Sequence, residues 1–238
     1  MTTTLAPGQF ANEEVPSRYG YPQGYAVKPL TVQIATLVKL FPNLDPVPAL
    51  AYTVNLPALP EGAEGWFAIP NWEKIAKTYN LAVETVLAII SSTRLFANNN
   101  YAGQFGPNCL LQSERSARMF TTLAQGQSGD ILIVPAQFGK RHTGRSVRRA
   151  QEVFTEQEFG LGAFAAACLL LTHPERLTSS NDLWIDCIGD EHAPDVAGRD
   201  IGVPCFYFDD RLTFDAFWSG TASGDLGSAS GFLPQSAA

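Results

Sequence analysis

The sequence predicts an α+β fold with an N-terminal extended arm and helices, a central buried helix and a C-terminal antiparallel sheet. Three observations lead to this prediction. Ten of the 16 prolines lie in the first 70 residues, apolar residues at helical spacing dominate up to residue 173, and alternating apolar residues dominate from residue 182 onward. Helices followed by strands in separate runs are typical of α+β proteins rather than of α/β proteins.

The chain has 238 residues, 45% of them hydrophobic, which is enough for one large core. We expect an extended Pro/Gly/Tyr-rich arm over residues 1–29 and a single globular α+β domain over residues 30–238. The arm contains "SRYGYPQGYAVKP", whose prolines remove backbone donors and oppose regular structure. We expect it to wrap over the domain, and a disordered tail over residues 1–25 is the alternative.

Apolar spacing predicts three helices before the centre of the chain. The first covers residues 30–41 and is stopped by Pro42, the second covers residues 72–90 with Asn71 as its cap, and the third covers residues 113–123. A short strand over residues 131–134 follows, and after it a basic loop.

The central helix has the strongest local signal in the chain. Thr155 and Glu158 fit a capping box, and Phe154 and Phe159 sit at the positions of a hydrophobic staple. The run "FGLGAFAAACLLLTH" behind them is apolar on nearly every side, as in a buried helix. We therefore expect a buried helix over residues 156–173.

The remaining residues read as strands joined by short connections. Alternating apolar residues in "LWIDCI", "PCFYF", "RLTFDAFW" and "SASGFLP" predict an antiparallel meander, with a tight turn at Asp209 and Asp210. This strand-rich part, residues 182–238, is acidic, because it holds 10 Asp and Glu residues against 2 Lys and Arg residues.

Cysteine usage and the N-terminus bear on the compartment. The four cysteines form no C-x-x-C pair, and three of them lie in apolar runs where a thiol behaves as a small buried hydrophobe. A secretory signal requires a basic residue followed by a continuous apolar segment, and the N-terminus lacks this pattern. We expect a cytoplasmic protein with reduced thiols and no membrane partner.

A basic stretch stands out in a chain of net charge −7. Residues 139–146, "GKRHTGRS", come close to the P-loop pattern G-x-x-x-x-G-K-[ST], with Arg145 in place of the lysine. Residues 135–138 separate the stretch from the predicted strand, its interior is bulky, and arginine does not replace lysine as a compact phosphate-binding charge. The pattern therefore does not indicate an NTPase.

The same stretch remains a candidate for binding anions. Arg141, Arg145 and Arg148 fall at helical i, i+4, i+7 spacing, and guanidinium groups bind carboxylate or phosphate bidentately. Internal pairing with the acidic residues 182–238 explains the pattern equally well. The candidate anion-binding residues are Lys140, Arg141, Arg145, Arg148 and Arg149.

A second cluster, "IDCIGDEHAPD", is acidic. Its oxygen ligands suit a divalent cation at the end of a strand, although an acidic surface loop is the more common explanation. The candidate metal ligands are Asp186, Asp190, Glu191 and His192, with Asp195 following in the loop. No other cofactor is expected.

These two clusters lead to two functional hypotheses. The first is a non-enzymatic binding or interaction protein whose residues 139–149 contact an anionic ligand, a protein or a nucleic acid. The second is a metal-dependent phosphodiesterase or nuclease that uses the acidic cluster of residues 186–195. The sequence does not distinguish the partner or the oligomeric state.

Overall fold

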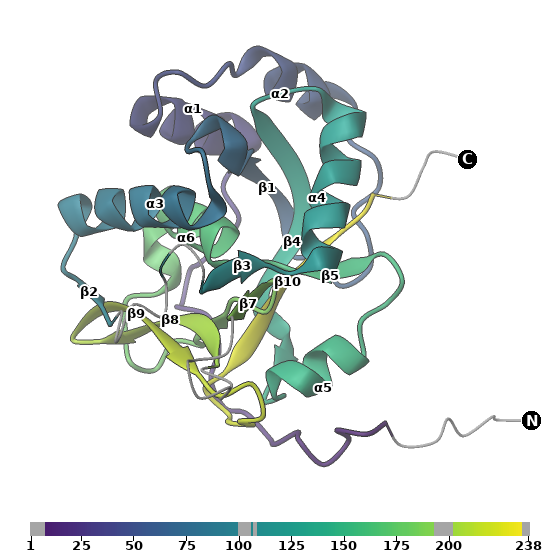
Figure 1. Ribbon diagram of the computed structural model, residues 1–238, viewed down its shortest axis with the longest axis vertical. Coiled ribbons are helices and arrows are strands. Elements are labelled where there is room, and N and C mark those ends of the chain that lie inside the picture. The colour runs from purple at the N-terminus through teal and green to yellow at the C-terminus, as the bar shows by residue number, and fades with distance from the viewer. Residues whose placement is uncertain (1–7, 100–105, 107–108, 193–201, 235–238) are drawn as a thin grey trace, which may run out of the picture.

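The computed structural model describes residues 8–99, 106, 109–192 and 202–234. In these residues six α-helices and a mixed eight-stranded sheet are interleaved along the chain (Figure 1). The α+β class is therefore confirmed, but the prediction of a sheet made only from C-terminal antiparallel strands is wrong. Three strands from the first 143 residues and β5 (Glu158–Gly160) complete the sheet, and two of its pairings are parallel.

The sheet runs in the order β1-β4-β10-β6-β8-β9-β2, with β5 paired to β10. The tight turn predicted at Asp209 and Asp210 joins β8 to β9, and Asp210 has a φ of 58°. A separate antiparallel pair is formed by β3 and β7. The strands are β1 (Gly65–Pro70), β2 (Phe96–Asn98), β3 (Leu110–Gln112), β4 (Ile131–Thr143), β5 (Glu158–Gly160), β6 (Ile185–Asp186), β7 (Asp190–His192), β8 (Val203–Asp209), β9 (Arg211–Phe217) and β10 (Gly227–Phe232).

Strand β4 is far longer than the four residues that the sequence predicts. It pairs with β1 along one edge and with β10 along the other, and these partners carry it through the stretch that we expected to be a loop. Gly139, the first glycine of the P-loop-like pattern, has a φ of +119° at an irregularity in the β4–β10 register, where the backbone of Gly227 lies close. This glycine therefore serves the sheet.

The helices agree with the sequence in part. The predictions for residues 30–41 and 113–123 are confirmed by α1 and α4, but the helix predicted over residues 72–90 is interrupted. Thr78 has an extended backbone that separates η2 from α3, while Asn71 caps η2 alone. The helices are α1 (Leu30–Leu40), α2 (Val47–Tyr52), α3 (Tyr79–Thr93), α4 (Glu114–Gln127), α5 (Val147–Glu152) and α6 (Ala163–Thr172), with 3₁₀ turns η1 (Thr53–Asn55), η2 (Trp72–Lys74) and η4 (Pro174–Arg176). Among the described residues, no helix is long and apolar enough to span a membrane.

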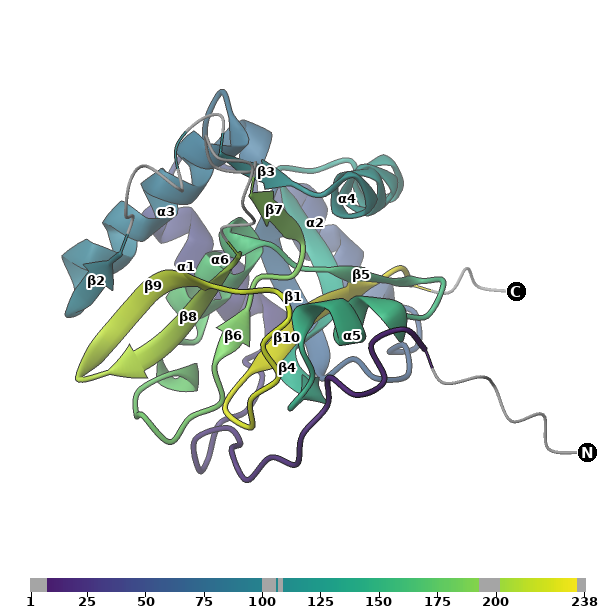
Figure 2. The same cartoon turned by 60° about the horizontal axis from the view of Figure 1, so that its bottom comes forward.

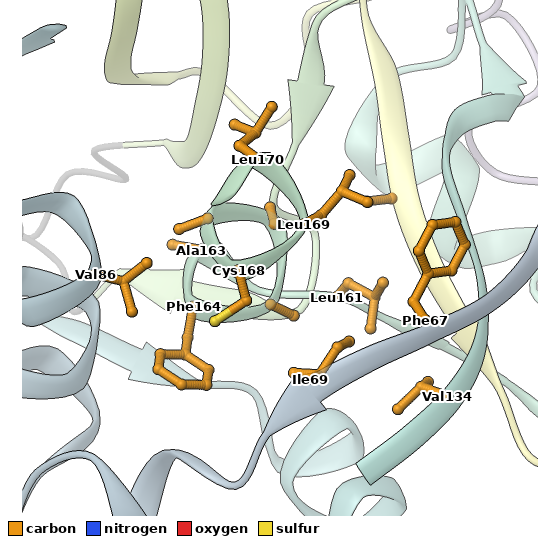
Figure 3. Close-up of a cluster of buried hydrophobic side chains, with 14 of the residues drawn as sticks. Phe67, Ile69, Val86, Val134, Leu161, Ala163, Phe164, Cys168, Leu169 and Leu170 are labelled. Carbon is orange, nitrogen blue, oxygen red and sulfur yellow. The ribbon is translucent and has the colours of Figure 1, made fainter. Parts of the chain in front are cut away.

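Helix α6 lies at the centre of the hydrophobic core, as expected for the central helix. Figure 3 shows it between Val86 of α3 and the β1 residues Phe67 and Ile69. Its predicted start is wrong, because the helix begins at Ala163 and not at residue 156. Residues 158–160 instead pair with β10 as β5, so tertiary pairing overrides the local capping signal.

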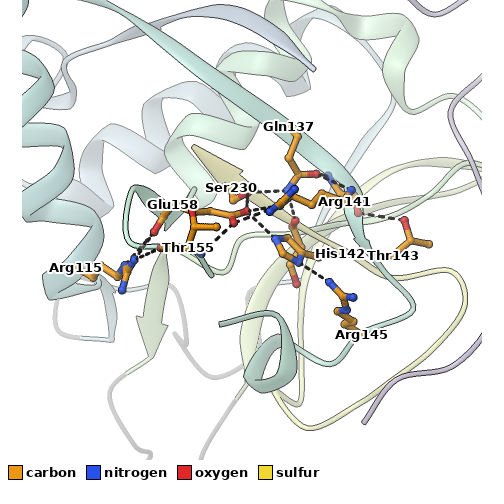
Figure 4. A network of polar contacts seen from close by, with 11 residues as sticks. Arg115, Gln137, Arg141, His142, Thr143, Arg145, Thr155, Glu158 and Ser230 are labelled. Carbon is orange, nitrogen blue, oxygen red and sulfur yellow. Dashed lines mark hydrogen bonds and ion pairs between the residues drawn. The ribbon is translucent and has the colours of Figure 1, made fainter. Parts of the chain in front are cut away.

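Glu158, which we expected to cap the central helix, is the fully buried centre of a polar network (Figure 4). Its carboxylate accepts hydrogen bonds from His142 Nε2 at 2.7 Å and Ser230 Oγ at 2.6 Å, and Arg141 Nε lies 3.2 Å from it. Gln137 Nε2 donates to Ser230 Oγ at 2.9 Å. The network thus joins β4, β5 and β10 through side chains.

The protonation states in this network follow from burial and hydrogen bonding. Burial favours a raised pKa for Glu158, but the hydrogen bonds from His142 and Ser230 outweigh it and lower the pKa. Burial lowers the pKa of His142. At neutral pH a neutral imidazole therefore donates its Nε2–H to a charged carboxylate, and its Nδ1 faces Arg145 Nη1 at 3.3 Å.

The arm over residues 8–29 runs along the surface of the domain, past α5 and the end of β4 (Figure 2). Glu14 forms a β-bridge with Arg145, and Gly20 forms one with Asp182. Farther along, the ring of Tyr21 lies 3.8 Å from the guanidinium carbon of the buried Arg176. The described part of the arm is therefore held at several points along its length.

Replacing Glu158 by Ala should lower the free energy of unfolding by about 3 kcal/mol, because the buried groups around it lose their acceptor. Denaturation by urea measures this change. Glu156→Ala, two residues away and exposed, is the control and should change stability by less than about 0.5 kcal/mol. Equal effects of the two substitutions would contradict the central role of Glu158.

Candidate functional site

The basic residues 140–149 lie beside carboxylates. Arg145 Nη2 is 3.1 Å from Glu14, Arg149 Nη1 is 2.9 Å from Glu152, Arg148 pairs with Glu13, and Arg141 pairs with Glu158. Lys140 Nζ lies 6.0 Å from the ring centroid of Tyr21. Among the described residues, the internal pairing is therefore made with the arm and with residues 152–158. Pairing with the acidic residues 182–238 that we considered is not found for the part of that range that the structure describes.

These pairs bear on the anion-binding hypothesis without testing it. An external anion at Arg145 or Arg148 has to compete with Glu14 or Glu13, which are already in place. Anion binding by residues 139–149 stays a prediction, and it now implies displacement of the arm.

The structure distributes the four proposed metal ligands over different surroundings. Asp186 is buried in β6 opposite Ser228 and Cys205, and Asp190 is buried at the start of β7. Glu191 is exposed, and His192 ends β7. Among the described residues, no group of three or more His, Cys, Asp or Glu side chains is placed to hold a metal ion, and Asp195 lies outside them.

The structure contains a pocket of about 280 Å³ between η2, α4 and the start of α6, which are labelled or can be traced in Figure 1. It combines apolar walls with a few polar side chains, as ligand-binding pockets commonly do. The residues lining it are Ile69, Pro70, Asn71, Trp72, Glu73, Tyr79, Gln112, Ala117, Phe120, Thr121, Ala124, Leu132, Gly162, Phe164 and Ala165.

Small side chains on the facing helices explain why the pocket is not filled. Along α4, Ala117, Phe120, Thr121 and Ala124 follow i, i+3, i+4, i+7 spacing and so lie on one face. Three of the four are too small to reach across to the opposite wall. The first turn of α6 contributes only one large side chain, Phe164, to this space.

Aromatic rings form the larger walls. The rings of Trp72 and Tyr79 are 5.9 Å apart at an interplanar angle of 88°, and those of Tyr79 and Phe164 are 6.5 Å apart at 57°. From α4, Phe120 packs edge-on against Phe159 at 5.3 Å. Each wall ring thus has a fixed aromatic neighbour, so the walls are formed before any ligand binds.

A buried acid supports one side of the pocket. The hydroxyl of Tyr79 donates to Asp190 Oδ1 at 2.6 Å, and the backbone N–H of Ala163 donates to Asp190 Oδ2 at 2.7 Å. Asp190 therefore caps α6 from a strand 27 residues farther along the chain. Its partner in the β3–β7 register is Gln112, which also lines the pocket.

Gly162 allows this arrangement. A Cβ atom at this position would lie 1.9 Å from Asp190 Oδ1 and 2.4 Å from the Tyr79 hydroxyl oxygen. No larger residue fits without moving the pair. Gly162 therefore forms a thin wall between the pocket and the buried carboxyl group.

Burial changes the acidity of both partners. It raises the pKa of Asp190 to about 7, although the hydrogen bonds from Tyr79 and Ala163 act in the opposite direction. Burial and the neighbouring Asp190 carboxylate raise the pKa of Tyr79 well above its usual value. Tyr79 therefore keeps its proton at neutral pH, while Asp190 titrates near neutrality.

Sequence reasoning missed this site. From the sequence, Tyr79 falls within the helix predicted over residues 72–90, Gly162 falls within the helix predicted over residues 156–173, and Asp190 is a candidate metal ligand. The residues that line the pocket come from seven helices and strands and from two connecting residues, so no local spacing unites them. The one usable signal is the set of small residues Ala117, Thr121 and Ala124 on one face of α4.

Comparison of the chain with protein-family models, with curated proteins and with solved structures finds no match in any of the three.

Replacing Gly162 by Ala should lower the free energy of unfolding by about 2 to 3 kcal/mol, because the new methyl group overlaps Asp190 and Tyr79. Thermal and urea denaturation measure the change. The control is Gly126→Ala in the last turn of α4, where no atom lies within 4 Å of the added Cβ. That substitution should raise stability by up to about 1 kcal/mol, since it favours helix. A neutral Gly162→Ala variant would contradict the close contact.

Asp190 should also make stability fall with rising pH. Its pKa is about 7 in the folded chain against an ordinary value of 3.8, so the folded state holds the proton more tightly. Its contribution is complete below pH 3.8 and is lost as pH rises towards 7. Asp190→Asn should flatten this part of the stability profile, measured by urea denaturation between pH 4 and pH 7.5. Burial also raises the pKa of Asp186 to about 7, so Asp186 contributes a second part of the slope, which Asp186→Asn should remove and which remains in the Asp190→Asn variant. An unchanged slope in the Asp190→Asn variant would show that Asp190 does not titrate in this range.

Proposed function

We propose that this protein binds a small, largely apolar molecule in the pocket between η2, α4 and α6. The observation that carries the proposal is a pocket of about 280 Å³ with aromatic walls, whose exposed lining residues are Thr121 of α4 and Glu73 of η2. Ligand sites for drug-sized molecules occupy roughly 300 to 1,000 Å³. This pocket lies just below that range, so it suits a small ligand.

The rigidity of the walls supports binding over incidental empty space. Trp72, Tyr79 and Phe164 are fixed by ring contacts, and the hydroxyl of Tyr79 is fixed by Asp190. A preformed pocket saves the conformational entropy that a ligand otherwise loses by ordering its site. The hydrogen bond from the buried Asp190 fixes the position of Tyr79, as supporting residues do behind a binding site.

Polar side chains add the means to orient a ligand. Asn71, Glu73, Gln112 and Thr121 line the pocket alongside the aromatic rings. Asn71 is held by the hydrogen bond that its Oδ1 accepts from the backbone N–H of Glu73, at 3.2 Å. A few fixed polar groups in an apolar pocket select ligands by hydrogen bonding, while the apolar area contributes most of the affinity.

The pocket is favoured over the basic residues 140–149 as the proposed site. The arginines there already have carboxylate partners within the chain, whereas the pocket presents concave apolar surface that no side chain fills. Binding of an anion through those residues and metal-dependent phosphodiester hydrolysis by residues 186–195 are still untested hypotheses.

The proposal is tested by blocking the mouth of the pocket. A library of aromatic and aliphatic fragments is screened against the whole chain by ligand-observed NMR, and the hits are measured again with Thr121→Trp. This variant should abolish binding, since its indole occupies the opening. Thr122→Trp is the matched control, because Thr122 is its exposed neighbour on α4, bonds its own i−4 carbonyl as Thr121 does, and does not line the pocket. Hits that bind both variants equally, or a screen without hits, would contradict the proposal.

A further inference from the structure

The described lining of the pocket carries one formal charge, and this charge is negative. Glu73 is the only formally charged side chain among the described residues that line it, and no Lys, Arg or His is among them. Lys74, which follows Glu73 directly, pairs instead with Asp130 at 3.0 Å. A cleft with charge of one sign and low-dielectric walls concentrates the opposite charge, so this pocket attracts cations and repels anions.

The aromatic walls point in the same direction. Four rings line the pocket, those of Trp72, Tyr79, Phe120 and Phe164. The faces of aromatic rings carry negative charge density and attract cations, tryptophan most strongly. The rings of Trp72 and Tyr79 are nearly perpendicular, so these two wall rings do not lie in one plane. Rings at several angles can surround a bulky cation rather than stack on a flat molecule.

The support beneath Tyr79 strengthens this wall. Its hydroxyl donates to the buried Asp190, and a phenol that donates to a carboxylate becomes richer in electrons by polarisation. The N-terminus of α6 carries partial positive charge and would otherwise favour an anion. Asp190 already accepts a hydrogen bond from the backbone N–H of Ala163 there, so a group of the protein itself balances this partial positive charge.

We infer that the ligand of this pocket is an organic ammonium ion, meaning a protonated alkyl or arylalkyl amine or a quaternary ammonium ion, held by the aromatic rings with Glu73 at the rim. This inference rests on the proposed binding function and specifies its ligand class. Carboxylate and aromatic faces together recognise a positive nitrogen that carries apolar substituents, since the substituents gain contact area and the charge gains electrostatic attraction.

The test compares probes that differ in charge at similar size. Choline is titrated against its neutral isostere 3,3-dimethylbutan-1-ol, and benzylamine against benzyl alcohol and benzoate, by isothermal titration calorimetry with the whole chain. We expect each cation to bind roughly tenfold more tightly than its neutral partner, and benzoate to bind most weakly. Thr121→Trp should abolish binding of every probe that binds.

Charge-neutral variants then assign the effect to the rim. Glu73→Gln should weaken binding of the cations by roughly two- to fivefold and leave benzyl alcohol unchanged. Glu84→Gln on α3 is the matched control, because it removes the same charge from an exposed residue outside the pocket. Equal weakening by the two variants would mean that only net charge matters and would overturn the role of Glu73.

The outcomes separate the two proposals. Neutral probes that bind as tightly as the cations, with binding abolished by Thr121→Trp, would overturn the ammonium inference and leave the binding pocket standing. Preferential binding of benzoate would do the same. No binding by any probe in this set, together with a fragment screen without hits, would overturn both.

Discussion

The N-terminus of α6 is the constraint on which much of the structure depends. This helix is buried on nearly every side, so water does not reach the amide groups of its first turn, and they need partners inside the protein. Asp190 supplies the partner for Ala163, and the same carboxyl group receives the hydroxyl of Tyr79. One buried acid therefore sets the positions of α3, α6 and β7 relative to each other. The burial that makes this cap necessary also raises the pKa of Asp190 to about 7.

The pocket follows from the same arrangement. Once α6 is fixed, its glycine-led start and the small residues of the α4 face leave a space that neither helix can fill. Empty apolar space costs stability, because the atoms that line it lose dispersion contacts. Here the space is kept open, aromatic rings form its walls, and the hydrogen-bonded pair of Tyr79 and Asp190 supports them. This arrangement is typical of a binding site.

Local signals in the sequence predicted the elements whose ends are set locally. Helix α1 ends before Pro42, Ser113 caps α4, and the Asp209–Asp210 turn joins β8 to β9, each through residues next to the boundary. Elements whose limits depend on distant partners were predicted poorly. Strand β4 extends to Thr143 because β1 and β10 pair with it. Glu158 fits a capping box locally, yet its carboxylate accepts hydrogen bonds from His142 and Ser230, which lie 16 and 72 positions away along the chain.

The candidate site could not be predicted from the sequence because it, too, depends on contacts between distant segments. The charged residues illustrate this dependence. Clustering of five basic residues along the chain suggested a binding surface, but the fold brings acidic residues of the arm to three of them. Glu73 belongs to no motif or charge cluster in the sequence, yet it is the one charged residue among the described residues that line the pocket. Clustering of charged residues along the sequence does not tell whether their side chains are exposed or paired, because both depend on which distant segments of the chain pack against them. A single carboxylate beside four aromatic rings is therefore the stronger indication of a ligand, and the sign of its charge identifies the kind of ligand to test.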